Sequence, residues 1–292
     1  MDIDWQHCKE VPYGMTYYPE AVLVGEKVYI GAGNSTNFRT TRVVMVYDIH
    51  VDEWSLLPDY DCYWFGMTSV DDKLVLVGGV TLDHEKRTNR LGTWEEELNS
   101  WSRTLPSMLT ARSGPTVATY KNRWIMAAGG FDFSDGFLST VEILDTPSGY
   151  WHSALPLPQP QNKMSSTIIG NMWYLLGGII SRQPTSCICV CACIDDLIYD
   201  AVFQVPSTSS SLWKFLPDTP VSGSTAVGLN GALLAIGGRY CAFIHHYQPS
   251  CNKWVKIGEL SSTREECACT ILPNGDIFIE GGVSSVDIGS LK

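Results

Sequence analysis

Apolar runs that end in a pair of small residues recur along the chain. Residues 74–77 and 233–236 are apolar at every position, with no alternation of apolar and polar side chains. An exposed antiparallel strand would alternate, whereas a strand covered on both faces would not. The closing pairs are Ala32-Gly33, Gly78-Gly79, Gly129-Gly130, Gly177-Gly178, Gly237-Gly238 and Gly281-Gly282. The pattern predicts buried strands in several sheets that stack face to face.

The small-residue pairs recur with a regular period. Their second members lie between 44 and 60 residues apart, and a tryptophan follows each of the first five pairs. Self-similarity at such a period is typical of a repeat architecture. The tryptophans are Trp54, Trp101, Trp151, Trp213 and Trp254.

Each repeat contains signals for four strands. A polar turn precedes every buried strand, and the Asn230-Gly231 and Asn274-Gly275 turns suit a type I′ hairpin because both central residues need φ > 0. The tryptophan begins a fourth strand, which often ends in Leu-Pro. Four antiparallel strands per repeat form the blade of a β-propeller. Third strands are expected at residues 43–47, 140–144, 201–205 and 242–246.

The two ends of the chain complement each other. Ten residues follow Gly282, enough for a third strand but not for a fourth. Trp5 and Val11-Pro12 reproduce the missing fourth strand at the start of the chain. We expect this N-terminal strand to complete the C-terminal blade and remove the open sheet edges. The prediction is an all-β, six-bladed β-propeller of four-stranded antiparallel blades that spans residues 1–292 as one domain.

These repeats resemble Kelch repeats over essentially the whole chain. The glycine pairs, the tryptophan that trails them and the period near 50 residues carry the resemblance, and Arg112 and Arg264 match the arginine that precedes a first strand in that family. The first repeat departs with Gly31-Ala32-Gly33, and the fourth carries an insertion. The resemblance implies the substrate-recognition domain of a BTB–BACK–Kelch adaptor of a cullin-RING ubiquitin ligase. BTB and BACK segments are absent from the sequence, so a cullin ligase is implied only as an indirect partner.

Arginine and aromatic residues gather in the loops of one face of the expected propeller. Loops between second and third strands and loops between blades emerge on the same face, which is the usual ligand face in Kelch relatives. Eight of the ten arginines fall in these loops. Arginine binds carboxylates with a planar fork and stacks on rings. The predicted partner-binding residues are Arg112, Arg264, Arg239, Arg39, Arg42, Arg87, Arg90, Tyr18, Tyr63, Trp64, Phe131, Phe133 and Tyr240.

This composition predicts a protein-interaction module that binds a short peptide of a partner protein, acidic or polar in character. Arg112, Arg239 and Arg264 are the preferred contacts because they lie at the blade necks nearest the axis. The alternative is that the arginines pair with local acids, among them Glu265 and Glu266, in a solvated rim that contributes little.

Cysteines form one conspicuous run, at every second residue from Cys187 to Cys193. A strand would place all four thiols on one face, too far apart for an easy disulfide. Zinc sites usually separate paired cysteines by two to four residues. We expect an apolar flap in the fourth repeat, with a metal or redox role as the alternative. Cys267 and Cys269 are expected to be structural residues of an inner strand.

Charge and composition narrow the possible partners and location. The net charge of −11 argues against a nucleic-acid partner, because phosphate binding needs a basic surface. No apolar stretch approaches the 18 residues of a membrane span. The N-terminus lacks the features of a signal peptide, so the ten cysteines are read as reduced thiols of a cytoplasmic protein.

A catalytic set does not emerge on the predicted face. Of the six histidines only His84 falls in one of its loops, and no Ser-His-Asp set, phosphate loop or metal cluster is found. No enzyme activity, cofactor or metal is therefore predicted. Some Kelch-like propellers are enzymes, a copper oxidase and a sialic acid mutarotase among them, so a sugar-active enzyme is one alternative. An actin-associated cytoskeletal scaffold is the other.

Overall fold

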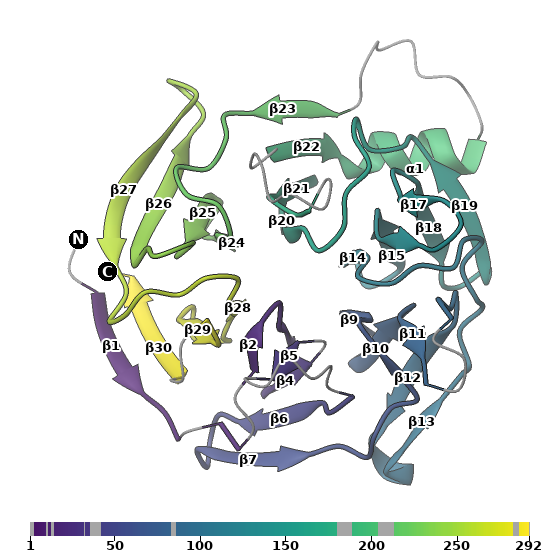
Figure 1. Cartoon of the computed structure of the whole chain (residues 1–292), viewed down its shortest axis with the longest axis horizontal. Coiled ribbons are helices and arrows are strands. Elements are labelled where there is room, and N and C mark those ends of the chain that lie inside the picture. Colours follow the sequence, from purple (N-terminus) through teal and green to yellow (C-terminus); the bar gives the residue numbers. More distant parts are fainter. Residues whose placement is uncertain are drawn as a thin grey trace.

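The computed structural model is a ring of sheets around a central axis (Figure 1). It describes residues 3–9, 11–12, 15–31, 33–35, 42–82, 86–179, 189–203, 213–282 and 286–291. The all-β propeller predicted from the repeats is confirmed.

Within these ranges the strands form six four-stranded antiparallel sheets. The sheets, with strands in pairing order, are as follows: β3 (Glu20–Val24), β4 (Lys27–Gly31), β6 (Met45–Asp48) and β7 (Glu53–Leu56); β9 (Gly66–Val70), β10 (Lys73–Val77), β12 (Leu91–Glu95) and β13 (Ser100–Ser102); β14 (Thr116–Tyr120), β15 (Trp124–Ala128), β18 (Val141–Asp145) and β19 (Tyr150–Ala154); β20 (Ser165–Ile169), β21 (Met172–Leu176), β22 (Cys189–Cys193) and β23 (Lys214–Leu216); β24 (Thr225–Leu229), β25 (Ala232–Ile236), β26 (Phe243–Gln248) and β27 (Lys253–Glu259); β28 (Ala268–Ile271), β29 (Ile277–Glu280), β30 (Val286–Leu291) and β1 (Ile3–His7).

In the described ranges, shorter elements lie in the loops between these strands. Three two-stranded sheets pair β2 (Met15–Tyr17) with β5 (Asn34–Ser35), β8 (Cys62–Tyr63) with β11 (Val80–Thr81), and β16 (Phe131–Asp132) with β17 (Gly136–Phe137). A 3₁₀ helix, η1 (Glu96–Leu98), connects β12 to β13. One α-helix, α1 (Ile194–Phe203), follows β22.

The strand at the start of the chain pairs with the strand at its end. β1 runs antiparallel to β30 over five residue pairs, from Ile3 opposite Leu291 to His7 opposite Asp287. The indole N–H of Trp5 also donates to the carbonyl oxygen of Glu259 at 2.9 Å. The two ends therefore share one sheet, with β1 as its outer strand (Figure 1).

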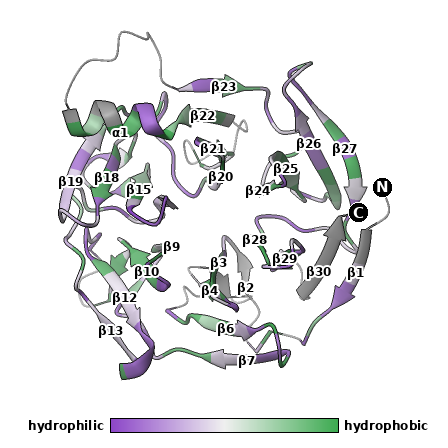
Figure 2. Cartoon of the chain, turned by 180° about the vertical axis from the view of Figure 1, so that it is seen from behind, coloured by the Kyte–Doolittle hydropathy of each residue, from purple (hydrophilic) through white to green (hydrophobic). Residues whose placement is uncertain are grey.

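The second strand of a blade is covered on both faces, as β10 illustrates. Leu74 and Leu76 pack in one buried cluster with Trp94, whereas Val75 and Val77 pack in another with residues of the next blade. All four side chains are at most 1% exposed. Figure 2 colours β10 as hydrophobic. Burial on both faces explains why these strands are apolar at every position.

The repeated tryptophans join each blade to the one before it. The indole N–H of Trp101 donates to the Pro58 carbonyl at 2.8 Å, and Trp151 donates to Pro106 at 2.9 Å. Trp54, Trp213 and Trp254 make the equivalent bonds to Lys9, Leu155 and Pro217. For Trp101, Trp151 and Trp254, the proline after the preceding outer strand thus supplies the carbonyl.

The fourth blade differs from the prediction. Its expected third strand at 201–205 is wrong, because residues 201–203 belong to α1, and β22 within the cysteine run is the third strand instead. Val190 and Ala192 of β22 are fully buried. The expectation of an apolar flap is therefore also wrong for residues 189–193, which pair with β21 and β23 in the sheet.

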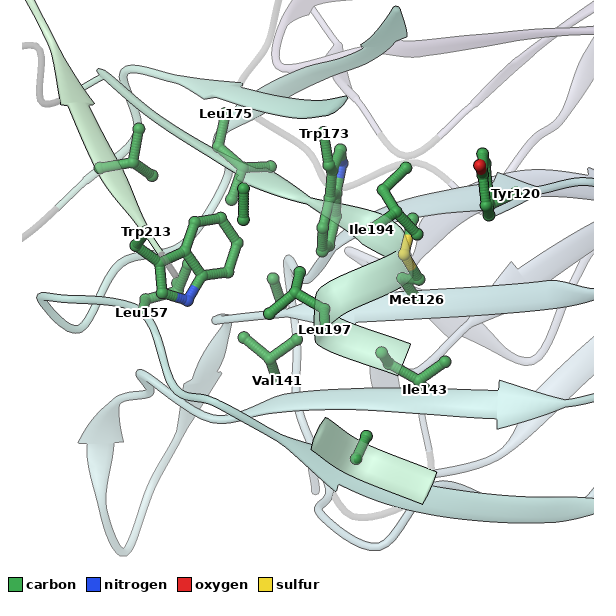
Figure 3. Close-up of a cluster of buried hydrophobic side chains, with 14 of the residues drawn as sticks. Tyr120, Met126, Val141, Ile143, Leu157, Trp173, Leu175, Ile194, Leu197 and Trp213 are labelled. Atoms are coloured by element: carbon green, nitrogen blue, oxygen red, sulfur yellow. The ribbon is translucent and has the colours of Figure 1, made fainter. Parts of the chain in front are cut away.

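Helix α1 packs against β19 of the third blade and β22 of the fourth, and it fills the core between these two blades (Figure 1). Ile194, Leu197 and Ala201 recur with helical spacing and are buried. Ile194 and Leu197 lie in one apolar cluster with Trp173 and Trp213 (Figure 3). Two aspartates in the first turn of α1 suit the positive end of the helix dipole.

Candidate functional site: the mouth of the axial cavity

A cavity of about 420 Å³ opens on the axis of the ring. It is lined by inner strands, by loops that connect successive blades, and by the loops that hold the glycine pairs of the fourth and fifth blades. Both kinds of loop therefore meet at one end of the propeller. We call the opening at this end the mouth.

The glycine pairs hold these loops in place. A Cβ atom on Gly129 would lie 2.2 Å from the carbonyl oxygen of Gln161, so this position needs glycine. The neighbouring Gly130 N–H donates to the same carbonyl at 2.8 Å. Each such contact fastens the end of a second strand to the loop that enters the next blade.

Six equivalent residues surround the mouth, each placed two positions before an inner strand. All six adopt the left-handed backbone conformation, with φ between 53° and 73°. They line the cavity, and we call them the mouth ring: Tyr18, Trp64, Gly114, Lys163, Gly223 and Glu266. A left-handed backbone is costly for residues other than glycine, and such residues tend to cluster at binding sites.

The four large side chains of the mouth ring contact one another across the opening. The Lys163 ammonium lies 4.0 Å from the centre of the Tyr18 ring and 4.9 Å from that of the Trp64 ring. The Tyr18 hydroxyl donates a hydrogen bond to the Glu266 carboxylate. Residues of four different blades thus form one network of rings and charges.

Burial in this network shifts three pKa values toward neutral pH. Desolvation raises the pKa of Glu20, the first residue of β3, to about 8, against the opposing hydrogen bond from the Met67 N–H at 2.6 Å. Desolvation also raises the pKa of Glu266 to about 7 and lowers that of Lys163 to about 8. The formal charge of the mouth therefore changes between pH 7 and pH 8.

The raised pKa of Glu20 predicts a loss of stability with rising pH. Its ordinary pKa is 4.5, so between that value and about 8 the folded chain keeps a proton that the unfolded chain has released. The contribution of Glu20 to the free energy of unfolding is therefore fully present below pH 4.5 and falls as the pH rises toward 8. Glu20→Gln should flatten this fall by on the order of 2 kcal/mol.

The measurement is urea unfolding of the wild type and Glu20→Gln from pH 5 to pH 8. Gln keeps an acceptor for the Met67 N–H but does not titrate. Glu97→Gln is the control, because Glu97 is exposed on η1. Equal pH slopes for the wild type and Glu20→Gln would contradict the prediction.

Two of the preferred contact residues are wrong as contacts. Arg112 and Arg264 are both 0% exposed, so a partner cannot reach their side chains. The Arg112 guanidinium donates to the Gly129 carbonyl at 2.7 Å and forms a buried ion pair with Glu142. Arg264 donates to the Gly281 carbonyl at 2.8 Å. Each arginine binds the glycine pair of its own blade, so its role is structural.

Three predicted residues do line the cavity: Tyr18, Trp64 and Arg239. Arg239 is exposed, and its guanidinium lies 5.4 Å from the centre of the Tyr240 ring. Tyr240 is 84% exposed. These residues remain available to a partner.

A second group of predicted residues lies on the rim beside Gly114. The Arg87 guanidinium lies 3.4 Å from the centre of the Phe133 ring and 5.2 Å from that of Phe131. The Phe131 backbone pairs with that of Ser113, next to Gly114 in the mouth ring. Phe133 is 68% exposed. This group places an arginine on an aromatic surface that solvent reaches.

The other predicted residues do not form a third group at the mouth. Arg42 forms an ion pair with Asp59 at 2.9 Å, as the solvated-rim alternative expected. Tyr63 packs edge-on against Trp64 with ring centres 5.5 Å apart, and Arg90 is exposed. Arg39 lies outside the described residues.

Lys163, Glu20 and Glu266 were missed as site residues. Their signal was present in the repeat itself, because aligning the six first strands would have placed Lys163 and Glu266 at the same position as Tyr18 and Trp64. The arginines stand out by their loop positions, and those positions favour Arg112 and Arg264.

The cavity also contains a pair of thiols. The sulfur atoms of Cys267, which directly precedes β28, and of Cys269 within it lie 3.6 Å apart, and both residues pack in one cluster with Val227 of β24. In the parts of the chain that are described, no group of three or more His, Cys, Asp or Glu side chains is placed to hold a metal ion. No helix in those parts is long and apolar enough to cross a membrane.

The chain is similar to several curated Kelch-like proteins, although no family model matches it. Kelch-like protein terF of Aspergillus terreus is 26% identical over 80% of this chain, and Kelch-like protein 38 of Mus musculus is 24% identical over 95%. Beta-scruin of Limulus polyphemus is 23% identical over 77%. The aligned regions cover 52%, 45% and 24% of these relatives, so the chain spans about half of their length or less.

The fold has a clear counterpart among solved structures. A chain described as "Structure of YjhT" superposes with a TM-score of 0.73 over 97% of this chain and 95% of its own length. The two are 16% identical, so the likeness concerns the fold alone. The curated relatives confirm the resemblance of this chain to Kelch-repeat proteins, and the solved structure supports the propeller fold.

Proposed function

We propose that this chain is a protein-interaction domain that binds a peptide of a partner protein at the mouth of the propeller. The observation that carries the proposal is a concave mouth flanked by exposed rings and arginines. Arg87 on Phe133 lies on one side, and Arg239 on Tyr240 lies on another. Aromatic residues and arginine dominate binding hot spots in protein interfaces.

The charge of the rim favours an acidic or polar peptide. Arginine binds a carboxylate with two parallel hydrogen bonds, and a neighbouring ring holds the guanidinium in position. Arg239 is exposed at the mouth, and Arg90 is exposed in a loop of the second blade. A peptide that crosses the mouth can therefore place carboxylates on the rim.

We further propose the role of substrate-recognition domain in a ubiquitin-ligase adaptor of the cytoplasm. The similarity to Kelch-like proteins over 80% and 95% of this chain supports it. Recruitment of a cullin would require segments outside these 292 residues. The mouth is proposed as a binding site and not as a catalytic site.

Substitution of the rim tests the proposal. We expect a peptide selected from an acidic library to bind at least about tenfold more weakly to the Arg87→Ala, Phe133→Ala double variant. Arg123→Ala, Trp124→Ala is the matched control, because Arg123 also lies on an aromatic ring, at 4.6 Å, but in a hairpin of the third blade. Equal affinity of both variants for the peptide, measured by titration calorimetry, would refute the proposed rim.

A further inference from the structure

Lys163 lies in the mouth as a bound ligand would. Its backbone belongs to the loop before β20, yet its ammonium lies between a ring from the first blade and a ring from the second. An ammonium within about 6 Å of a ring centre is attracted to the face of that ring. Tyr18 and Trp64 therefore form an aromatic site for a cation.

Two carboxyl groups complete this site. Glu266 is fixed by the hydroxyl of Tyr18, and Glu20 is fixed by the Met67 N–H. In their ionised forms both favour the charged form of Lys163, Glu266 above about pH 7 and Glu20 above about pH 8. Rings and carboxylates together are the chemistry that recognises organic ammonium groups.

The glycine at position 114 of the mouth ring leaves space for the side chain of Lys163. A Cβ atom on Gly114 would lie 3.1 Å from Cγ and 3.7 Å from Cε of Lys163, so the lysine stem passes directly over this residue. Glu266 crosses Gly223 in the same way, with its Cγ 3.4 Å from the Cβ position. The mouth ring has glycine where a neighbour must cross and large side chains where contacts form.

We infer that the mouth of this propeller binds an organic ammonium group of its partner, such as a lysine side chain, and that Lys163 occupies this site until the partner displaces it. The inference rests on the proposed function, since it names the group of the bound peptide that enters the cavity. The rim arginines take acidic residues of the same peptide.

The side chain of Lys163 can be displaced from this aromatic site. Its stem is a flexible four-carbon chain, which loses rotamer freedom when held in one position. Desolvation lowers its pKa to about 8, so the surroundings do not fully replace the water that its ammonium has lost. The cavity of about 420 Å³ leaves room beside it for an incoming group.

The test removes the internal ligand and offers a small cation. Choline carries a fixed positive charge, and 3,3-dimethyl-1-butanol has the same shape without charge. We expect Lys163→Ala to bind choline at least about tenfold more tightly than the wild type, and to prefer choline over the neutral alcohol. Lys163→Gly, which suits the left-handed backbone at this position, should behave in the same way.

Two controls locate the effect. Lys121→Ala removes a lysine that also lies on a tyrosine ring, at 4.7 Å, but in a hairpin turn, and should not change choline binding. Adding Trp64→Ala to Lys163→Ala should abolish the gain. Unfolding curves establish that each variant is folded.

Choline binding that is no tighter in either Lys163 variant than in the wild type overturns the inference. Equal binding of choline and the neutral alcohol does so as well. These outcomes are separate from the rim experiment, because choline does not need Arg87 or Phe133, and loss of peptide binding in the rim variant does not depend on Lys163.

Discussion

Replacing Arg112 by alanine is expected to destabilise the propeller by about 3–5 kcal/mol, because it leaves a buried carboxylate without its partner. Glu142 is 2% exposed and accepts from the Arg112 guanidinium and from the backbone N–H groups of Leu109 and Thr110. Without the guanidinium, its negative charge remains in an environment that water does not reach. The Gly129 carbonyl also loses its donor.

Urea unfolding of Arg112→Ala and Arg123→Ala provides the comparison. Arg123 pairs with Asp145 at 2.6 Å, but its side chain is 49% exposed, so its removal should cost about 1 kcal/mol or less. The double variant Arg112→Met, Glu142→Leu should recover part of the lost stability, because it removes the unpaired charge but leaves the Leu109 and Thr110 N–H groups and the Gly129 carbonyl without their partners. Equal losses in the two single variants would contradict the burial argument.

This result also changes how a binding experiment is interpreted. A loss of partner binding in Arg112→Ala or Arg264→Ala would report damage to the blade and not a lost contact. Rim residues such as Arg87 and Phe133 are therefore the informative positions for binding.

Deleting residues 1–12 is expected to lower the melting temperature by at least about 10 °C and to cause aggregation. The deletion removes β1 and its five residue pairs with β30. It also removes the Trp5 bond to Glu259 and the Lys9 carbonyl that accepts from Trp54. The unpaired edge of β30 would then be open to strands of other molecules.

Thermal unfolding and light scattering at several protein concentrations measure this effect. Removal of residues 1 and 2 alone is the control, because β1 begins at Ile3. An unchanged melting curve after deletion of residues 1–12 would show that pairing with β1 does not stabilise the ring.

The blades could be predicted because their signals are local. In five of the six repeats a glycine pair ends the buried strand, and tryptophan marks the outer strand. The Asn230-Gly231 turn has φ > 0 at both positions, as a type I′ hairpin needs. The same prediction for Asn274-Gly275 is wrong, because Asn274 lacks a positive φ and residues 272–276 form a longer connection. The structure adds a reason for the tryptophan, since the Trp101 indole reaches the Pro58 carbonyl of the preceding blade. A short-range pattern of this kind survives in each repeat.

The fourth blade could not be read in this way. Its third strand, β22, comes after an interruption of the period, and every second residue of it is cysteine, a residue with no clear strand preference. The helical spacing of Ile194, Leu197 and Ala201 competes with the strand predicted at 201–205. Burial against Trp173 and Trp213 decides the outcome.

The sequence by itself determined that this chain is a β-propeller of Kelch-like repeats, with loops of two kinds on one face. Only the tertiary structure decided which loop residues are buried and which are exposed to solvent. Arg112 lies in a loop between two blades, and Arg239 lies in a loop that follows a glycine pair. The Arg112 guanidinium pairs with the buried Glu142, whereas Arg239 is exposed to solvent. Lys163 reaches Tyr18 and Trp64 only because the ring brings separate blades together. A strand depends on neighbours in sequence, whereas burial and the mouth network depend on neighbours in space.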